Sequence, residues 1–191
     1  MQQTAYCFTG LGADEQLFAN IAVPGFTVKH IQWLPPLPSE TLPQYAIRLS
    51  AQIRPEAPVL LGVSFGGMLA VEAAKHLKAK QTILISSVKT ASHFPFYYHL
   101  ANKLKIIDWL PATIFTTPSP VVDFLFGVET SADKKLLRHF IQQSDSHYIR
   151  WALQAIINWN NQTFPQNLVQ IHGNKDRIIP LPKSVDHVIK D

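Results

Sequence analysis

The chain of 191 residues suits one compact domain and leaves little room for two. Its net charge of +4 comes from scattered lysines and arginines without a run of about five like charges, which argues against a nucleic-acid-binding protein. Hydrophobic residues make up 47% of the chain and charged residues only 16%, as in a globular protein with an extensive apolar interior.

The sequence carries no signal for export or membrane insertion. The first residues, MQQT, have neither the basic start nor the apolar run of a signal peptide, and no stretch of about eighteen apolar residues could span a bilayer. The single cysteine, Cys7, excludes an internal disulfide and lies in an apolar run, where packing is its expected role. We therefore expect a cytoplasmic protein without a membrane span.

Strand and helix patterns alternate along the first half of the chain. Short apolar runs that are typical of strands occur at residues 5–8, 26–33, 58–61 and 82–86. Helix patterns separate them at residues 14–21, 39–53 and 67–77. This alternation predicts an α/β fold with a mostly parallel central sheet and helices on both faces.

The alternation stops at about residue 88 and resumes at about residue 165. The stretch between them is helical by pattern and rich in aromatic residues, and it interrupts the chain between two predicted strands. Such an insertion predicts a helical cap over a functional site. We expect most of its aromatic side chains to join the cap to the core and some to line an apolar substrate pocket, with Trp151 and Phe124 as candidates.

Two further strands are predicted near the end of the chain. Residues 167–173 form an apolar run that ends in a glycine, and a polar loop containing Asp176 follows. Residues 184–190 have the pattern of one more strand.

Ser64 is the candidate nucleophile. It lies in the pentapeptide Gly62-Val63-Ser64-Phe65-Gly66, at the point where a predicted strand gives way to a helix. A G-x-S-x-G at such a corner forces the serine into a strained turn that lifts its Oγ clear of the sheet, and Cβ atoms at the flanking positions would collide with the neighbouring strand or helix. The pentapeptide alone is common, but its position between strand and helix favours a catalytic serine over a structural turn. In parallel sheets, sites form beyond the carboxyl ends of the strands.

Together with Thr9-Gly10-Leu11-Gly12 and His172-Gly173-Asn174-Lys175-Asp176, the pentapeptide resembles the α/β-hydrolase fold superfamily. The resemblance covers nearly the whole length but begins at the family's third strand, so the first hairpin is absent. It implies a single α/β-hydrolase domain over residues 1–191, with the helical cap inserted at about 88–165.

The resemblance also implies the roles of individual residues. Ser64 would attack, Asp176 would be the acid that orients a catalytic histidine, and the backbone amides of Leu11 and Phe65 would form the oxyanion hole. Thr9 stands where the family often has a histidine, which does not affect the backbone donor but changes the hydrogen bonds behind it.

The catalytic histidine is the open position of this set. Only His187 follows Asp176, and it lies inside a predicted strand, whereas the family takes this histidine from the loop after that strand. A final strand without a covering helix would also leave an apolar face bare. We therefore expect a C-terminally truncated sequence, with the histidine and a helix encoded beyond Asp191. The alternatives are His187 as the base and a non-catalytic protein.

The resemblance implies a carboxylesterase-like serine hydrolase that cleaves an ester or related acyl bond of a small apolar substrate without a cofactor. A non-catalytic ligand-binding homologue remains an alternative, as does a lyase or C–C bond hydrolase that uses the same site. No H-E-x-x-H or paired-cysteine pattern indicates a metal site, and no glycine-rich phosphate loop occurs. The sequence does not indicate an oligomeric state.

Overall fold

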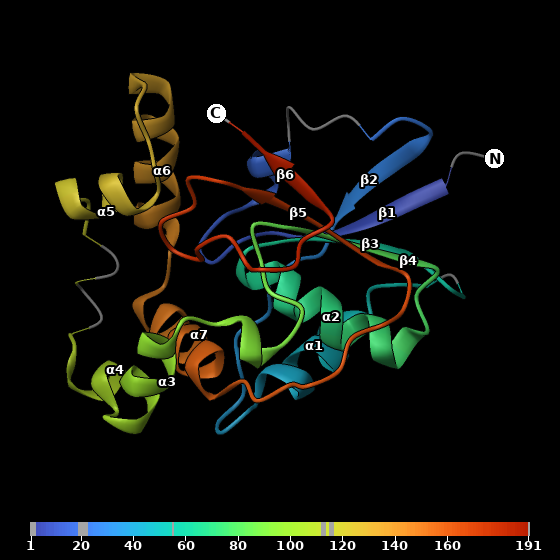
Figure 1. The fold of residues 1–191 in the computed structure, drawn as a ribbon, viewed down its shortest axis with the longest axis horizontal. Coiled ribbons are helices and arrows are strands. Elements are labelled where there is room, and N and C mark those ends of the chain that lie inside the picture. The colour runs from blue at the N-terminus through green and yellow to red at the C-terminus, as the bar shows by residue number, and fades with distance from the viewer. Residues whose placement is uncertain (1–2, 19–22, 55, 112–113, 115–116, 191) are drawn as a thin grey trace.

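In the computed structural model, which describes residues 3–18, 23–54, 56–111, 114 and 117–190, six strands form one sheet in the order β2-β1-β3-β4-β5-β6 (Figure 1). The strands are β1 (Gln3–Phe8), β2 (Phe26–His30), β3 (Val59–Val63), β4 (Gln81–Ile85), β5 (Leu168–Gly173) and β6 (His187–Ile189). Every neighbouring pair is parallel, so the predicted parallel α/β sheet is confirmed.

The direction of each crossover determines which face of the sheet a helix covers. The chain moves from β1 to β2 in one direction, and then from β2 to β3 and on to β4 in the other. Because such crossovers are right-handed, α1 (Leu42–Ser50) and α2 (Phe65–Leu77) share one face, on the lower side of the sheet in Figure 1, and the short 3-10 helix η1 (Glu15–Phe18) lies on the other. Successive side chains of β3 point to opposite faces of the sheet. Leu60 packs with the residues of α2 on one face, and Leu61 packs with Phe18 of η1 on the other.

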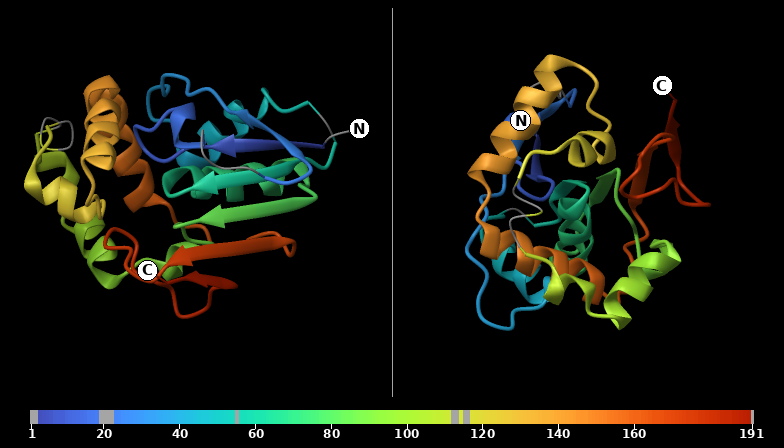
Figure 2. Two further views of the ribbon diagram at one scale, coloured as in Figure 1. Left: turned by 90° about the horizontal axis from the view of Figure 1, so that it is seen from above. Right: turned by 90° about the vertical axis from the view of Figure 1, so that its left-hand side faces the viewer.

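In the described part of the chain, helices occupy the segment between β4 and β5, which the sequence predicts to be a cap. They are η2 (Ala91–His93), α3 (Phe96–Lys103), α4 (Ile106–Trp109), α5 (Pro120–Leu125), α6 (Ser131–Gln143) and α7 (Ser146–Asn158). The left view of Figure 2 shows them beyond the arrowheads of the strands, at the carboxyl edge of the sheet. This is the edge at which a parallel sheet places its functional site. None of the described helices is both long and apolar enough to cross a membrane.

Several predicted elements are shorter in the structure. The strand predicted over 26–33 ends at His30, because the following residues leave the sheet and the Trp33 indole N–H bonds to Thr9 and Ala13. The last strand covers only His187–Ile189. The helix predicted over 14–21 is a single 3-10 turn as far as it is described, and its residues 19–21 lie outside the described part of the chain.

The glycines around Ser64 are required by close backbone contacts. A Cβ on Gly66 would lie 2.2 Å from the carbonyl oxygen of Thr9 and 2.3 Å from that of Phe8, and neither is a flexible side chain. We expect Gly66→Ala to lower the free energy of unfolding by about 3 kcal/mol, measured by urea denaturation. Gly173→Ala is the matched control, because a Cβ there would meet nothing within 4 Å. Equal stability of the two variants would contradict the predicted clash.

Candidate active site

Ser64 occupies a strained corner between β3 and α2. Its φ of 52° and ψ of −120° are unusual for a residue with a side chain, and such strain is commonly found at functional sites. Three hydrogen bonds hold the corner: its N–H donates to the Ile85 carbonyl (2.9 Å), and its carbonyl accepts from the Gly67 N–H (2.9 Å) and the Ser87 hydroxyl (2.7 Å). The strained turn expected from the sequence is therefore present, and the Ser64 side chain is only half-buried.

This corner lies where the sheet changes direction. The chain leaves β1 toward one edge of the sheet and β3 toward the other, so Ser64 lies at a topological switch point, the position at which parallel sheets commonly bind their ligands. A Cβ built on Gly10, just after β1, would lie 3.7 Å from the Ser64 Cβ. Leu11 follows Gly10 and Phe65 follows Ser64. The structure thus brings together the two segments that were expected to supply the oxyanion-hole amides.

Thr9 anchors the loop that carries Leu11. The fully buried Thr9 hydroxyl donates to the Ala13 carbonyl (2.7 Å) and accepts from the Trp33 indole N–H (2.9 Å), which also bonds to the Ala13 carbonyl (3.1 Å). These bonds close the loop on itself and tie it to the segment after β2. Trp33 did not stand out in the sequence, where it was counted among the residues of a strand.

Asp176 lies in the loop after β5. Its Oδ1 accepts hydrogen bonds from the backbone N–H groups of Ile178 (3.0 Å) and Ile179 (2.9 Å), and its Oδ2 lies 3.4 Å from Nε2 of His172. Burial alone would raise the pKa of Asp176, but these contacts outweigh it and hold the pKa below its ordinary value. The side chain is therefore a carboxylate at neutral pH, as an acid that orients a histidine must be.

His172 contacts this loop through its Nε2. It is fully buried in β5, and its Nε2 donates to the Ile179 carbonyl at 2.7 Å. This ring nitrogen is therefore engaged within the loop that contains Asp176.

Ser64 and Asp176 lie at the same edge of the sheet with one strand between them. Ser64 follows β3 and Asp176 follows β5, with β4 in the middle. Two strand spacings amount to about 10 Å. An imidazole that hydrogen-bonds through both nitrogens bridges about 8 Å, so a histidine between the two loops could contact both.

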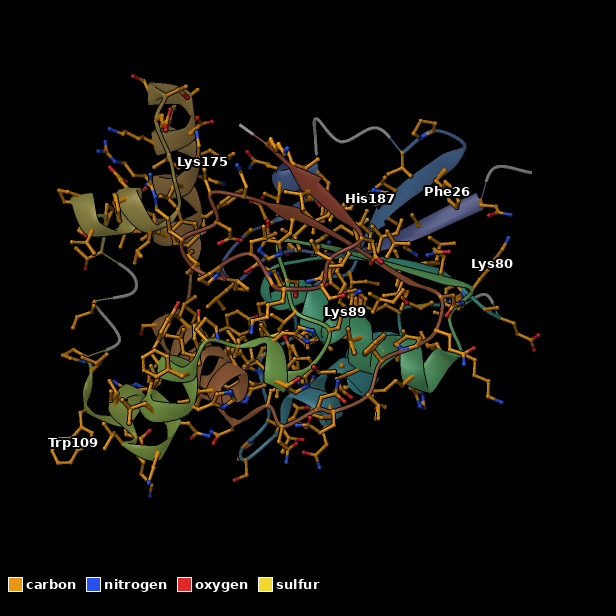
Figure 3. The ribbon with its side chains drawn as sticks, in the orientation of Figure 1. Phe26, Lys80, Lys89, Trp109, Lys175 and His187 are labelled. Atoms are coloured by element: carbon orange, nitrogen blue, oxygen red, sulfur yellow. The ribbon has the colours of Figure 1, made fainter. Side chains whose placement is uncertain are left out.

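His187 is not brought to this position. In the sheet register it lies opposite Ile171, which lies opposite Ile85, which lies opposite Val63. This row puts three strand spacings, about 14 Å, between His187 and β3, far beyond the reach of a hydrogen bond. Figure 3 labels the exposed His187 at the start of β6. The other end of β6 runs beside the loop that carries Asp176, because Ile189 pairs with Gly173 and accepts a hydrogen bond from the Asn174 N–H (3.0 Å).

Trp151 packs against the core next to Phe65, the residue that follows Ser64. Its ring lies 4.5 Å from that of Tyr45 and 6.3 Å from that of Phe65, measured between ring centres, and its indole N–H donates to the Glu40 carbonyl (2.9 Å). The side chain is half-buried. Tyr148, also on α7, packs over Trp33 at 5.7 Å. These rings form an aromatic wall next to the residue that follows Ser64.

Phe124 lies at the outer rim of the site. Its side chain on α5 is 61% exposed, so it does not line an enclosed pocket. The Arg177 guanidinium lies 4.1 Å from the centre of its ring, and Nη1 of Arg177 donates to the Phe124 carbonyl (2.7 Å). Phe124 therefore contacts the loop that carries Asp176, through the residue that follows Asp176.

Other hollows and clusters do not add to this site. A surface hollow of about 420 Å³ is lined by Lys75, Lys78 and residues 163–167, at the far end of α2 from Ser64. Among the described residues, no three His, Cys, Asp or Glu side chains are grouped closely enough to hold a metal ion.

Comparison with known proteins connects this geometry to a fold. No protein-family model and no curated protein sequence matches the chain. Solved structures do. One is a hydrolase from Pseudomonas aeruginosa PA01, with 13% identity and a TM-score of 0.65 over 100% of this chain and 82% of that one. Another is MenH from S. aureus, with 15% identity and a TM-score of 0.67 over 100% of this chain and 85% of that one. An extracellular α/β-hydrolase from a Paenibacillus species also matches, with 16% identity and a TM-score of 0.64 over 99% of this chain and 89% of that one. The chain has the α/β-hydrolase fold.

Proposed function

We propose that this protein is a serine hydrolase that cleaves an ester or related acyl bond of a small apolar substrate. The observation that carries the proposal is the corner at Ser64, where a residue with φ of 52° lies between the end of β3 and the start of α2, against the loop that follows β1. A strained, half-buried serine at a switch point of a parallel sheet is the arrangement that a nucleophile elbow requires.

The proposed reaction has two halves. Ser64 Oγ attacks the acyl carbon while a histidine takes its proton, and the backbone amides of Leu11 and Phe65 stabilise the oxyanion. The tetrahedral intermediate then breaks the bond to the leaving group, which receives that proton. Water attacks the acyl-enzyme in the same way and releases the acid and free Ser64. Asp176 keeps the histidine in the required tautomer, and its bonds to two backbone amides keep it ionised.

We propose that the histidine lies beyond Asp191, in a loop that follows β6. The carboxyl end of β6 runs beside the loop that carries Asp176, so a residue in a loop after β6 would lie close to Asp176. The position of His187 at the start of the strand favours this over His187 itself as the base. Reading the encoding gene past the codon for Asp191 is the direct test.

A second candidate is a ligand-binding protein on the same fold. It is favoured by the two histidines nearest the acid in the sequence, since His172 is engaged with the Ile179 carbonyl and His187 is three strands from Ser64. A fluorophosphonate probe separates the two candidates, because it labels an activated serine and ignores an ordinary one. Labelling of the complete gene product at Ser64, located by peptide mapping, would support the hydrolase. Binding of an apolar acyl compound without any labelling would support the ligand-binding protein.

The aromatic wall at Trp151 predicts a preference for acyl chain length. Each buried methylene contributes about 0.8 kcal/mol, or about fourfold in kcat/KM. For esters from acetate to octanoate, we expect Trp151→Ala to shift the preferred length, and Phe124→Ala to shift it less because Phe124 is largely exposed. Trp109→Ala is the matched control, since Trp109 is 84% exposed and points away from the sheet at the outer edge of the cap (Figure 3). If all three variants kept the chain-length preference of the parent, Trp151 would have a packing role only.

A further inference from the structure

A chain of buried polar groups leads from β5 to the backbone of the nucleophile. Gln170 Nε2 donates to the carbonyl of Ser87 (2.7 Å), and the Ser87 hydroxyl donates to the carbonyl of Ser64 (2.7 Å). Gln170 and Ser87 are both fully buried. The two residues are 83 positions apart in the sequence and meet only because β4 and β5 are neighbours.

The Ser87 bond acts on the strained part of the corner. The Gly67 N–H, which also bonds to the Ser64 carbonyl, belongs to the first turn of α2 and moves with it. Ser87 approaches from the segment after β4, so it ties the same carbonyl to the sheet. The space for its hydroxyl exists because position 67 is a glycine, where a Cβ would lie 2.3 Å from the Ser87 Oγ.

Only one end of the Gln170 side-chain amide is hydrogen-bonded in the described structure. The neighbour of Gln170 in the sheet register is Leu84, which is fully buried on the face that α2 covers. In the described structure, Oε1 of Gln170 is buried without a hydrogen-bond partner, which is unfavourable for the fold. An apolar side chain would avoid that cost, but it would leave the buried Ser87 carbonyl without the bond from Nε2.

We propose that Ser87, held in place by Gln170, is a positioning residue that fixes the backbone of Ser64 and thereby the direction of its Oγ. This inference rests on the proposed hydrolase function. Without the hydroxyl of Ser87, the carbonyl of Ser64 keeps only its bond within α2 and the corner can relax. Substrate binding, which the proposed function assigns to the side chains of the cap, is unaffected, whereas attack by Oγ depends on its position to within about 1 Å.

The test compares Ser87→Ala and Gln170→Leu with Thr82→Val in the complete gene product. Thr82 is a matched control because its hydroxyl is also buried in the sheet and has no partner in the described structure, and it lies at the other end of β4 from the site. We expect Ser87→Ala to lower kcat and the rate of fluorophosphonate labelling about tenfold, with KM within about twofold of the parent. Gln170→Leu should lower both rates about threefold, with the melting temperature measured beside them to report the loss of the bond to the Ser87 carbonyl. Thr82→Val should match the parent.

Amide hydrogen exchange of the peptide 62–68 tests the same idea without relying on activity. We expect faster exchange in this peptide for Ser87→Ala and Gln170→Leu but not for Thr82→Val. If the parent is never labelled, the hydrolase function fails, yet faster exchange would still support the positioning role. Parent-like labelling, kcat and exchange in both variants would overturn the inference. If Ser87→Ala does not fold, Gln170→Leu decides by the same measurements.

Discussion

Ser64→Ala is expected to lower turnover of an aryl ester by about three orders of magnitude or more and to abolish fluorophosphonate labelling. The variant loses the oxygen that forms the acyl-enzyme bond in the proposed reaction. Alanine keeps the Cβ, so the strain at φ of 52° remains, as do the three hydrogen bonds to the backbone N–H and carbonyl of position 64. The melting temperature should therefore stay near that of the parent.

Ser92→Ala serves as the control, because Ser92 is an exposed residue of η2 whose hydroxyl bonds to Thr90. It should keep full turnover and labelling. Undiminished ester hydrolysis by Ser64→Ala in protein free of the parent enzyme would exclude Ser64 as the nucleophile.

Asp176→Asn is expected to lower kcat by about three orders of magnitude. The amide has nearly the shape of the carboxylate, and its oxygen can still accept from the Ile178 and Ile179 N–H groups. Its other atom is an NH₂ donor, however, which cannot accept the N–H of a catalytic histidine and so leaves that ring in the wrong tautomer. Steady-state kinetics on the same aryl ester provides the measurement, with the urea midpoint reported beside it.

His187→Ala is the companion to this variant. His187 is exposed and three strands from Ser64, so the replacement should leave kcat unchanged. The opposite pattern, a loss of activity in His187→Ala and none in Asp176→Asn, would contradict the assignment of the acid and make His187 the base.

Local sequence was enough to predict the corner at Ser64. Gly62 is needed by contacts with Gly66 and Gly67 inside the same corner, and the spacing of the glycines around the serine is visible in the chain itself. The contacts of Gly66 with Phe8 and Thr9, and of Gly67 with Ser87, come from distant segments. The parallel sheet was predictable for a similar reason, because alternating strands and helices leave few other connections.

Contacts between distant segments were not predictable in this way. The bond from Trp33 to Thr9 and the bond from Gln170 to Ser87 depend on which strands are neighbours. The separation of His187 from Ser64 likewise follows from strand order and register, neither of which a single strand pattern contains. Phe124 was expected to line a pocket, but α5 leaves it largely exposed, because the direction in which a short helix faces depends on its packing partners.

The contact between Arg177 and Phe124 couples the position of α5 to that of the loop that carries Asp176. Arg177 is the residue after Asp176, and it holds α5 through both the Phe124 ring and the Phe124 carbonyl. Any outward swing of α5 has to break these contacts or pull on the loop that carries the carboxylate. In the proposed enzyme, a displacement of α5 would therefore also disturb the position of the Asp176 carboxylate.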